Sequence, residues 1–434
     1  MKICSKKDIK VITAVMAGTM LLGGCGKTSA KKNEIPLKND PQLKTEIDLN
    51  EVKNTSYDED LMNEEYRRYC FDLMNRSIAD NNGSGNIMIS PASIMMALDM
   101  VAAGSKNESL KQLTDLFAEN QDPLLQQAFA SALMDRINNS EEIEFSCANA
   151  VWSNRTLLGD SVNTEYVEYI KETFGAEYTQ TEFDINTVNE INGWVDENTD
   201  HMIKEVVDSL DAETVMVLVN AIAFDAKWAE PYDSDHIKDG EFRSANSGTQ
   251  NATFLNESTE YYFETEKATG FIKNYKGGEY AFLMILPAEE SVNANEFLKG
   301  FTADDYEKFI KSRTDEYDVY TKMPEFKYDY EFSVNDTLKN LGVTDIFVPG
   351  KADLSGITGA PGDIYVSQVI HKTHIEVDSN GTKAAAVTAV TLHCAGAEPV
   401  TREFRQVICD RPFAYAIVDL ETMAPVFIGT VNEI

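Results

Sequence analysis

The run Gly381 to Val390, GTKAAAVTAV, constrains the fold more than any other stretch of the chain, and it directly follows the strand-like segment HIEVD. No Asp, Glu, Lys or Arg occurs from Ala384 to Ala397, although 25% of the chain is charged. With the two-residue period of a strand, Lys383 falls on one face and small neutral side chains occupy the other. We therefore expect a strand with one face fit for burial, preceded by Gly381, which gives backbone freedom for a hinge. For these ten residues alone, an Ala-rich loop or a short helix is the alternative.

Length and composition indicate one large globular domain. The chain has 434 residues, of which 43% are hydrophobic, and we find no internal repeat and no Pro/Gly-rich linker after about residue 60. The hydrophobic fraction is sufficient for a substantial core. The formal net charge of -34 argues against nucleic acid as a partner, because phosphates would be repelled over most of the surface.

The N-terminus predicts export and anchoring. Several lysines precede the apolar run VITAVMAGTMLL, which ends at Leu22-Gly23-Gly24-Cys25. A pair of small residues before a cysteine resembles the lipobox of bacterial lipoproteins. We expect residues 1–24 to be a signal peptide, Cys25 to carry the lipid, 25–60 to be a polar tether and 61–434 to be the folded domain. The protein would then be extracellular and anchored to the bacterial cell membrane, with shedding as a variant; an ordinary cleaved signal is the alternative.

The cysteines predict no disulfide framework, because their spacing is irregular. Cys70, Cys147 and Cys409 lie among apolar residues and are expected to be small core side chains. Cys394 follows the uncharged run, where we expect an exposed thiol that could be oxidised.

Hydrophobic periodicity predicts helices early in the chain and strands later, an α+β order without the regular alternation of a parallel doubly wound sheet. The expected helices are Glu64–Ala79, Pro91–Ala103, Glu108–Leu116, Asp122–Ile137, Thr164–Phe174 and Thr187–Asn198. The expected strands are NIMIS, Ile143–Trp152, Thr214–Asp225, Ala281–Leu286, Asp318–Lys322, Ile364–Asp378 and Pro425–Val431.

Motifs of catalysis do not occur in the sequence. We find no GxSxG, HExxH, P-loop or complete GxGxxG, and none of the five histidines has the helical spacing of metal ligands. A Ser/His/Asp triad assembled through space stays open. We expect no enzyme, no metal and no cofactor.

Four segments in order resemble the serpin family of protease inhibitors. They are NIMISPASIMMALDMVAAGS, LVNAIAFDAKW, IYVSQVIHKTHIEVDSNGTKAAAVTAV and VICDRPFAYAI, the last followed by APVFIGTV. MPEFKYDYEFSVNDTLKNLGVTDIF and ADLSGIT match as well. The resemblance implies one large sheet, two further sheets, about nine helices and an exposed reactive-centre loop, here about residues 379–406, in one domain.

The resemblance also implies a mechanism. A serine protease cleaves the exposed loop and forms an acyl-enzyme, and the loop then inserts into the large sheet and carries the protease with it before the acyl bond hydrolyses. An inserting strand needs small neutral side chains on its inner face. The hinge residues Gly381, Thr382, Lys383, Ala384, Ala385 and Ala386 meet this need, which favours an inhibitor. Ser379 and Lys383 depart from the glutamates common in the family.

Further roles follow from the resemblance by position. Ser90, Ser93, Asn220 and His371 match the polar cluster beneath the large sheet that controls its opening, and Trp228 matches the tryptophan near the point where the loop first enters. Taken alone, each of these would be an ordinary core residue. In the last segment, Ala414 stands where a larger apolar residue is usual.

The target depends on the scissile bond. Counting about fourteen residues from Thr382 gives Ala395-Gly396, a bond that suits elastase-like serine endopeptidases. Cys394-Ala395, Arg402-Glu403 for trypsin-like enzymes, and bonds within Thr391–His393 are alternatives. We expect a monomeric suicide inhibitor; a non-inhibitory serpin-like binding protein and an inhibitor of papain-like cysteine proteases are the other functions considered.

Overall fold

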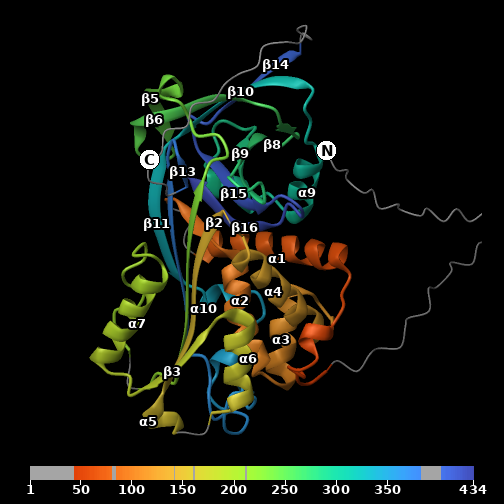
Figure 1. The fold of residues 1–434 in the computed structure, drawn as a ribbon, viewed down its shortest axis with the longest axis vertical. Helices are drawn as coiled ribbons and strands as arrows, with labels where there is room; N and C mark the ends of the chain where they lie inside the picture. Colours follow the sequence, from red (N-terminus) through yellow and green to blue (C-terminus); the bar gives the residue numbers. More distant parts are fainter. Residues whose placement is uncertain (1–43, 81–84, 141, 160–161, 211–212, 383–401) are drawn as a thin grey trace, which may run out of the picture. The chain divides into compact units, whose positions relative to one another are not determined.

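The computed structural model describes residues 44–434 except 81–84, 141, 160–161, 211–212 and 383–401. The described residues belong to one compact unit, Leu43–Ile434. The described residues form ten α-helices, close to the number that the resemblance implies, and three sheets (Figure 1). The helices are α1 (Glu59–Asp80), α2 (Pro91–Ala103), α3 (Asn107–Phe117), α4 (Pro123–Asn138), α5 (Arg155–Leu158), α6 (Thr164–Phe174), α7 (Ile185–Asn198), α8 (Ala294–Lys299), α9 (Ala303–Lys311) and α10 (Asn335–Asn340).

The first sheet, called the central sheet below, holds the candidate site. Its strand order is β11 (Phe326–Ser333), β12 (Gln368–Val377), β13 (Gly381–Thr382), β4 (Met216–Lys227), β2 (Ile143–Asn154) and β3 (Glu177–Thr181). Strand β4 is buried over nearly its whole length, because α2 and the second sheet cover one of its faces and α7 contributes to a separate apolar cluster against the other. A strand buried on both faces appears in sequence as a continuous apolar run, as in MVLVNAIAF.

The other two sheets stack beside the central sheet. The second has the order β1 (Ile87–Ile89), β16 (Pro425–Val431), β15 (Phe413–Asp419), β9 (Tyr280–Pro287), β8 (Ala268–Asn274) and β7 (Tyr262–Glu264). The third has the order β14 (Glu403–Ile408), β10 (Tyr317–Pro324), β6 (Gly248–Thr259) and β5 (Ile237–Ser244). The three predicted sheets are therefore confirmed, and they have six, six and four strands.

Helix α2 shows how local sequence fixes one element that positions the site. Ser90 caps its N-terminus by accepting a hydrogen bond from the Ser93 backbone N–H, Pro91 occupies the first turn, and Gly104 follows its last residue. All its residues are buried, as the apolar composition all round the helix predicts. Both N-terminal serines are thereby held beneath the central sheet.

The predicted tether over 25–60 is wrong for its last part. Residues 44–58 pack on the domain, with Val52 buried in a short 3-10 helix (Val52–Asn54) and Ile47, Leu49 and Tyr57 packed against the core. Helix α1 then starts at Glu59. A few apolar side chains spaced among polar residues suffice to attach this segment to the domain. Because they are so few, the sequence shows no hydrophobic pattern that would predict the packing.

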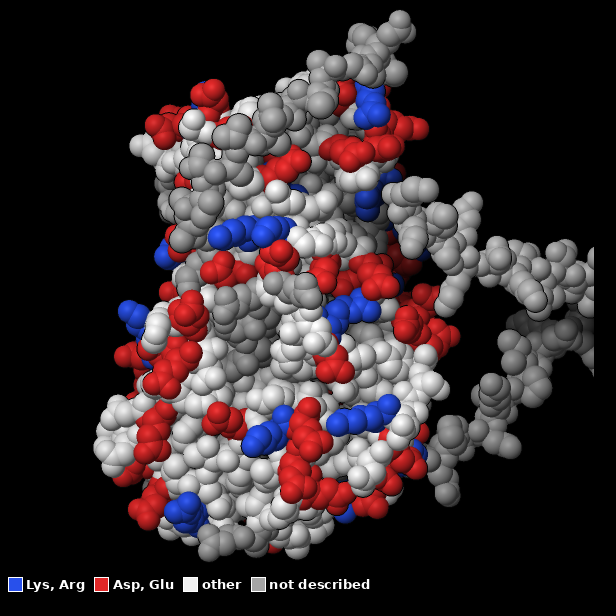
Figure 2. All heavy atoms as spheres, viewed as in Figure 1, with Lys and Arg blue, Asp and Glu red and all other residues white. Residues whose placement is uncertain are grey.

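Acidic side chains are spread over the visible face of the molecule from end to end (Figure 2). Lys and Arg lie scattered among them, without a continuous basic patch among the described residues of this face. None of the helices in the described ranges is long and apolar enough to cross a membrane.

Candidate functional site: a strand seam and its hinge

Strands β12 and β4 meet in parallel along Gln368–His374 and Val217–Ala223, a line of pairing called the seam below. At one end of the seam β13 lies between the two strands, antiparallel to both. Thr382 pairs with Val377 of β12 and with Ala226 of β4. The central sheet is therefore closed along the seam and already parted at one end by the first residues of the small-residue run.

Hydrogen bonds to its backbone carbonyls hold the chain that leads into β13. The Trp228 indole N–H donates to the Asp378 carbonyl, and the Trp228 backbone N–H donates to the Asn380 carbonyl, both at 2.9 Å. The Tyr232 N–H donates to the Ser379 carbonyl at 2.9 Å. The predicted hinge begins at Gly381; from here on the word hinge denotes the described stretch Asp378–Thr382 that leads into it. The structure brings Trp228 into direct contact with this stretch.

Thr382 is seated in a buried pocket of aromatic rings. Its hydroxyl lies 2.6 Å from the Tyr275 hydroxyl, and both residues are at most 1% exposed. The Tyr275 ring stacks on Trp228, with centroids 4.7 Å apart and planes at 10°. A small side chain with one hydroxyl fits this seat and satisfies the tyrosine.

Gly381 is needed here for space. A Cβ atom at this position would lie 2.2 Å from the Ala226 carbonyl oxygen and 2.8 Å from the Lys227 Cα, both backbone atoms that cannot move aside. The sequence suggested conformational freedom; close backbone approach is the reason that the geometry gives.

Glu325 holds the backbone of the hinge at position 379. A Glu325 carboxylate oxygen accepts a hydrogen bond from the Ser379 backbone N–H at 3.2 Å. Partial burial raises the pKa of Glu325, and the nearby charge of Asp378 raises it further. A glutamate in place of Ser379 would bring a third carboxylate to this corner of the hinge.

A buried hydrogen-bond network, called the seam cluster below, crosses the seam beneath the hinge. Asn220 of β4 lies beside His371 of β12 in the register, and its side-chain oxygen accepts from the Ser93 hydroxyl and from His371 Nδ1, the latter at 3.2 Å. The Asn220 amide group donates to the Ser93 carbonyl at 2.9 Å and to Asn149 Oδ1 at 2.7 Å. The Ser90 backbone N–H donates to His371 Nε2 at 3.0 Å. Ser90, Ser93, Asn220 and His371 thus lie together, as the resemblance implies; their role in opening the sheet stays a prediction.

The network fixes the protonation of His371. Because Nε2 accepts a hydrogen bond from Ser90, the ring proton resides on Nδ1 and points to Asn220. The ring is fully buried, and burial lowers the pKa of His371 to about 3. The neutral imidazole is therefore part of the native network at physiological pH.

The remaining predicted site residues lie outside the described residues. They are Cys25, Lys383, Ala384, Ala385, Ala386, Cys394, Ala395 and Gly396. The loop predicted over 379–406 is too long at its C-terminal end, because β14 begins at Glu403 and pairs with β10 from that residue. This pairing also argues against Arg402-Glu403 as the scissile bond. A protease binds the chain on both sides of the bond it cleaves, and from Glu403 onward the chain is already paired with β10. In the described part of the chain, no group of three His, Cys, Asp or Glu side chains is placed to hold a metal ion.

Three residues that contact the site were not predicted from the sequence. Asn149, Tyr275 and Glu325 contact residues that are 71, 107 and 54 positions away, respectively. Asn149 is a polar residue in an apolar strand, which is a weak signal; Tyr275 and Glu325 have none, because only the sheet topology brings them to the seam and the hinge.

The comparisons define the class of protein that has this fold and site. The family described as Serpin (serine protease inhibitor) matches residues 64–434, and the chain belongs to the serpin family. Serpins are generally protease inhibitors rather than enzymes. The three-sheet α+β architecture above is the serpin fold.

Individual relatives span most of the domain. Iripin-5 of Ixodes ricinus is 31% identical, covering 80% of this chain and 89% of its own length. Leukocyte elastase inhibitor A of Mus musculus is 28% identical, covering 82% and 95%. An uncharacterised serpin-like protein of Methanosarcina mazei is 29% identical, covering 98% and 97%.

Solved structures include two states of one thermophilic serpin. Tengpin in the native state is 33% identical, with a TM-score of 0.79 over 90% of this chain and 100% of that chain. Tengpin in the latent state is 32% identical, with a TM-score of 0.73 over 87% and 98%. The chain is therefore more similar to the native state than to the latent one.

Proposed function

We propose that this serpin is a suicide-substrate inhibitor of serine proteases, with elastase-like enzymes as targets. The observation that carries the proposal is the hinge: Gly381 and Thr382 already part β12 from β4 at one end of a seam that is otherwise closed. Small, neutral residues continue the run from Ala384. A strand that extended β13 along the seam would exchange parallel β12–β4 hydrogen bonds for two antiparallel ladders.

The free energy for insertion comes from this exchange. The closed seam offers one ladder of hydrogen bonds between β12 and β4, and an inserted strand would form two. The seam cluster opposes the exchange, because Asn220 and His371 must give up their mutual hydrogen bond as the strands separate. Insertion is then slow until a cleaved loop supplies the new strand, which suits a metastable native state.

The proposed scissile bond is Ala395-Gly396. A small residue on the acyl side suits a small specificity pocket, and the leukocyte elastase inhibitor of mouse is among the relatives. The protease would acylate at Ala395 and release the chain from Gly396. The inhibitor is consumed rather than turned over, so the chain acts as a substrate and not as an enzyme.

The test is to mix the protein with an elastase-like serine protease and examine the products on a denaturing gel. An SDS-resistant complex and a released fragment that begins at Gly396 are expected. Cleavage without any complex contradicts inhibition and favours a non-inhibitory binding protein. Complex formation with papain-like enzymes alone would assign the chain to cysteine proteases.

We also propose that the protein acts at the bacterial cell surface, attached through lipidated Cys25. Support comes from the lysines, the apolar run and the small residues before that cysteine. Expression of the whole chain with radiolabelled palmitate should label the wild type and leave Cys25→Ala unlabelled. Equal labelling of both would refute the anchor.

A further inference from the structure

Lys273 is the only lysine among the described residues that is buried. It lies in β8 directly after Phe271 and Ile272, and 6% of its surface is exposed. Its Nζ pairs with a carboxylate oxygen of Glu257 in β6 at 2.5 Å. Lysines are seldom buried unless they are paired, and a buried ion pair is weak evidence for stability by itself. The contacts that the pair makes with its surroundings therefore matter more than the pairing.

The ammonium group of Lys273 lies over an aromatic ring. Its Nζ is 4.1 Å from the ring centroid of Tyr232 and 6.0 Å from that of Trp228. The Tyr232 hydroxyl donates to the other carboxylate oxygen of Glu257 at 3.0 Å. Burial raises the pKa of Tyr232 well above its ordinary value, and the charge of Glu257 raises it further, so the hydroxyl keeps the proton that it donates. One ion pair thus holds Tyr232 at both its ring and its hydroxyl.

Tyr232 and Trp228 are also the residues that hold the hinge. Their backbone N–H groups donate to the carbonyls of Ser379 and Asn380, both at 2.9 Å. Within the described part of the chain, Lys273 itself forms no hydrogen bond to the hinge. It can act on the hinge only through the two aromatic residues. A cation over a ring that is shielded from water stabilises the contact more than one at an exposed site.

We propose that Lys273 and Glu257 are positioning residues for the hinge: their ion pair fixes Tyr232, so that its backbone N–H stays on the Ser379 carbonyl and β13 keeps its place between β12 and β4. Without the ammonium group, the hinge lifts more often. The consequence for inhibition rests on the proposed function, because a hinge that lifts before cleavage can enter the seam without a protease.

Hydrogen exchange of the folded protein tests the positioning role without a protease. Lys273→Met keeps the length of the side chain and removes its charge. The protection of the Tyr232 amide should fall about tenfold, as expected for a cation lost from a shielded ring, while the amides of β15 keep theirs. Lys273→Arg keeps the charge and should stay close to the wild type. Unchanged protection in Lys273→Met, or no rescue by arginine, would overturn the proposal.

A double variant separates the cation from its partner. Lys273→Met combined with Glu257→Gln removes both charges, strands no carboxylate and keeps an oxygen that can accept from the Tyr232 hydroxyl. Protection of the Tyr232 amide should stay about tenfold low. Recovery to the wild-type value would mean that a stranded carboxylate caused the single effect, which contradicts the proposal. Because no charge is left unpaired, this variant also decides the matter if Lys273→Met does not fold.

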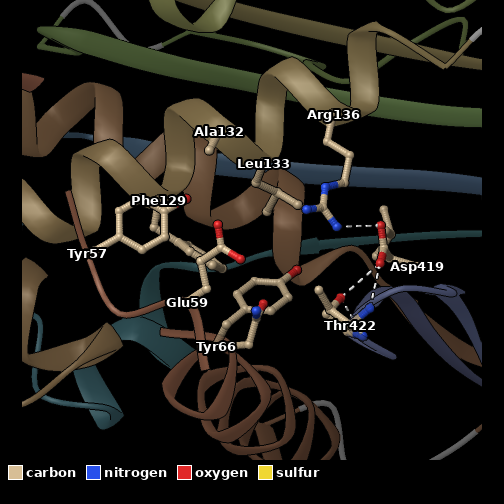
Figure 3. A pocket seen from close by; sticks show the side chains of 12 residues that line it. Tyr57, Glu59, Tyr66, Phe129, Ala132, Leu133, Arg136, Asp419 and Thr422 are labelled. Carbon is tan, nitrogen blue, oxygen red and sulfur yellow. Dashed lines mark hydrogen bonds and ion pairs between the residues drawn. The ribbon is translucent and has the colours of Figure 1, made fainter. Parts of the chain in front are cut away.

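The Arg136–Asp419 ion pair provides a matched control. It lies in the pocket between α1, α4 and the turn that joins β15 to β16, with 3.1 Å between the charged groups (Figure 3). The Asp419 side chain is 7% exposed, as is that of Lys273. In the described ranges, neither member forms a hydrogen bond or ion pair with the hinge, Trp228 or Tyr232. Arg136→Met should lower the unfolding temperature and leave the Tyr232 amide protected; a fall equal to that in Lys273→Met would refute a specific role.

Storage of the uncleaved protein tests the consequence for inhibition. Lys273→Met should lose its capacity to form an SDS-resistant complex about tenfold faster than the wild type, since entry into the seam starts from the lifted hinge. Equal rates of loss would contradict this consequence. A wild type that forms no complex would refute the proposed function and leave the exchange result standing, whereas unchanged Tyr232 protection would refute the positioning role at any complex yield.

Discussion

Replacing Thr382 by valine removes one hydroxyl from the hinge and leaves its shape almost unchanged. The hydroxyl lies 2.6 Å from that of Tyr275, and the pair is buried. Losing a buried hydrogen bond costs about 1 kcal/mol, and the stranded tyrosine hydroxyl adds about 1 kcal/mol more. We therefore expect Thr382→Val to favour hinge opening by about 2 kcal/mol, or about thirtyfold in the opening equilibrium.

Hydrogen exchange measures this opening directly. The backbone N–H groups of Trp228 and Tyr232 donate to the carbonyls of Asn380 and Ser379, so both amides exchange when the hinge lifts. Their protection should fall about thirtyfold in Thr382→Val, while the amides of β15 in the second sheet keep theirs.

The double mutant separates the hydrogen bond from other effects. Tyr275→Phe should lower protection much as Thr382→Val does. Thr382→Val combined with Tyr275→Phe leaves no stranded hydroxyl, so the loss should shrink from about 2 kcal/mol in each single variant to about 1 kcal/mol, a coupling of about 3 kcal/mol. Thr382→Ser, which keeps the hydroxyl, serves as the matched control. Purely additive single effects, or unchanged protection in Thr382→Val, would refute this account of the hinge.

Four other perturbations follow from the same contacts. Asn220→Ala breaks four buried hydrogen bonds and should lower the free energy of unfolding by about 3–5 kcal/mol in denaturant titrations, and a loss below about 1 kcal/mol would contradict the network. Since burial lowers the pKa of His371 to about 3, its contribution is fully present above about pH 6.5 and is lost as the pH falls. The wild type should therefore lose about 1.4 kcal/mol per pH unit below about pH 6.5 relative to His371→Gln, and parallel pH curves would exclude a buried neutral ring. Gly381→Ala forces a Cβ against the Ala226 carbonyl and should displace the hinge, seen as faster exchange of the Trp228 amide; a wild-type rate would show that the approach is not close. Thr382→Arg places a charge in the aromatic seat and should yield cleaved protein in place of complex on a denaturing gel, whereas unchanged complex yield would contradict the hinge assignment.

Elements with strong local signals could be predicted from the sequence. Pro91–Ala103 and Thr164–Phe174 match their predicted bounds, because a proline or an asparagine cap starts each helix, a glycine follows it, and the apolar pattern between is clear. The Pro425–Val431 strand matches as well, since it is a short run that is buried throughout.

Other elements gave little local signal. Strands β5 and β6 were not predicted, because only Phe242 of β5 is buried and the burial pattern of β6 does not alternate cleanly. Helix α9 was not predicted either, although it begins with a capping box at Thr302 and Asp305, whose residue spacing is present in the sequence.

The residues of the candidate site also differ in how well the sequence predicts them. Ser90, Ser93, Asn220 and His371 of the seam cluster could be named because each lies in a segment that resembles the family. Asn149 lies in none of these segments, and the seam itself is a property of sheet topology. The buried position of Thr382 depends on Tyr275. This tyrosine lies outside the strands of the central sheet, and no sequence motif marks it. Its importance therefore becomes visible only when the chain is folded.

The central claim is that the seam must open for inhibition, and a reversible lock across it is the most direct test. Lys372 and Ala221 are partners across the seam, at a strand spacing that suits a disulfide, and Ser153 and Met216 are partners across β2 and β4, which stay paired. We predict that oxidised Lys372→Cys/Ala221→Cys is cleaved by an elastase-like protease without forming an SDS-resistant complex, and that reduction restores the complex. The Ser153→Cys/Met216→Cys control should form the complex in both states. A seam-locked, oxidised protein that still traps the protease would contradict the account.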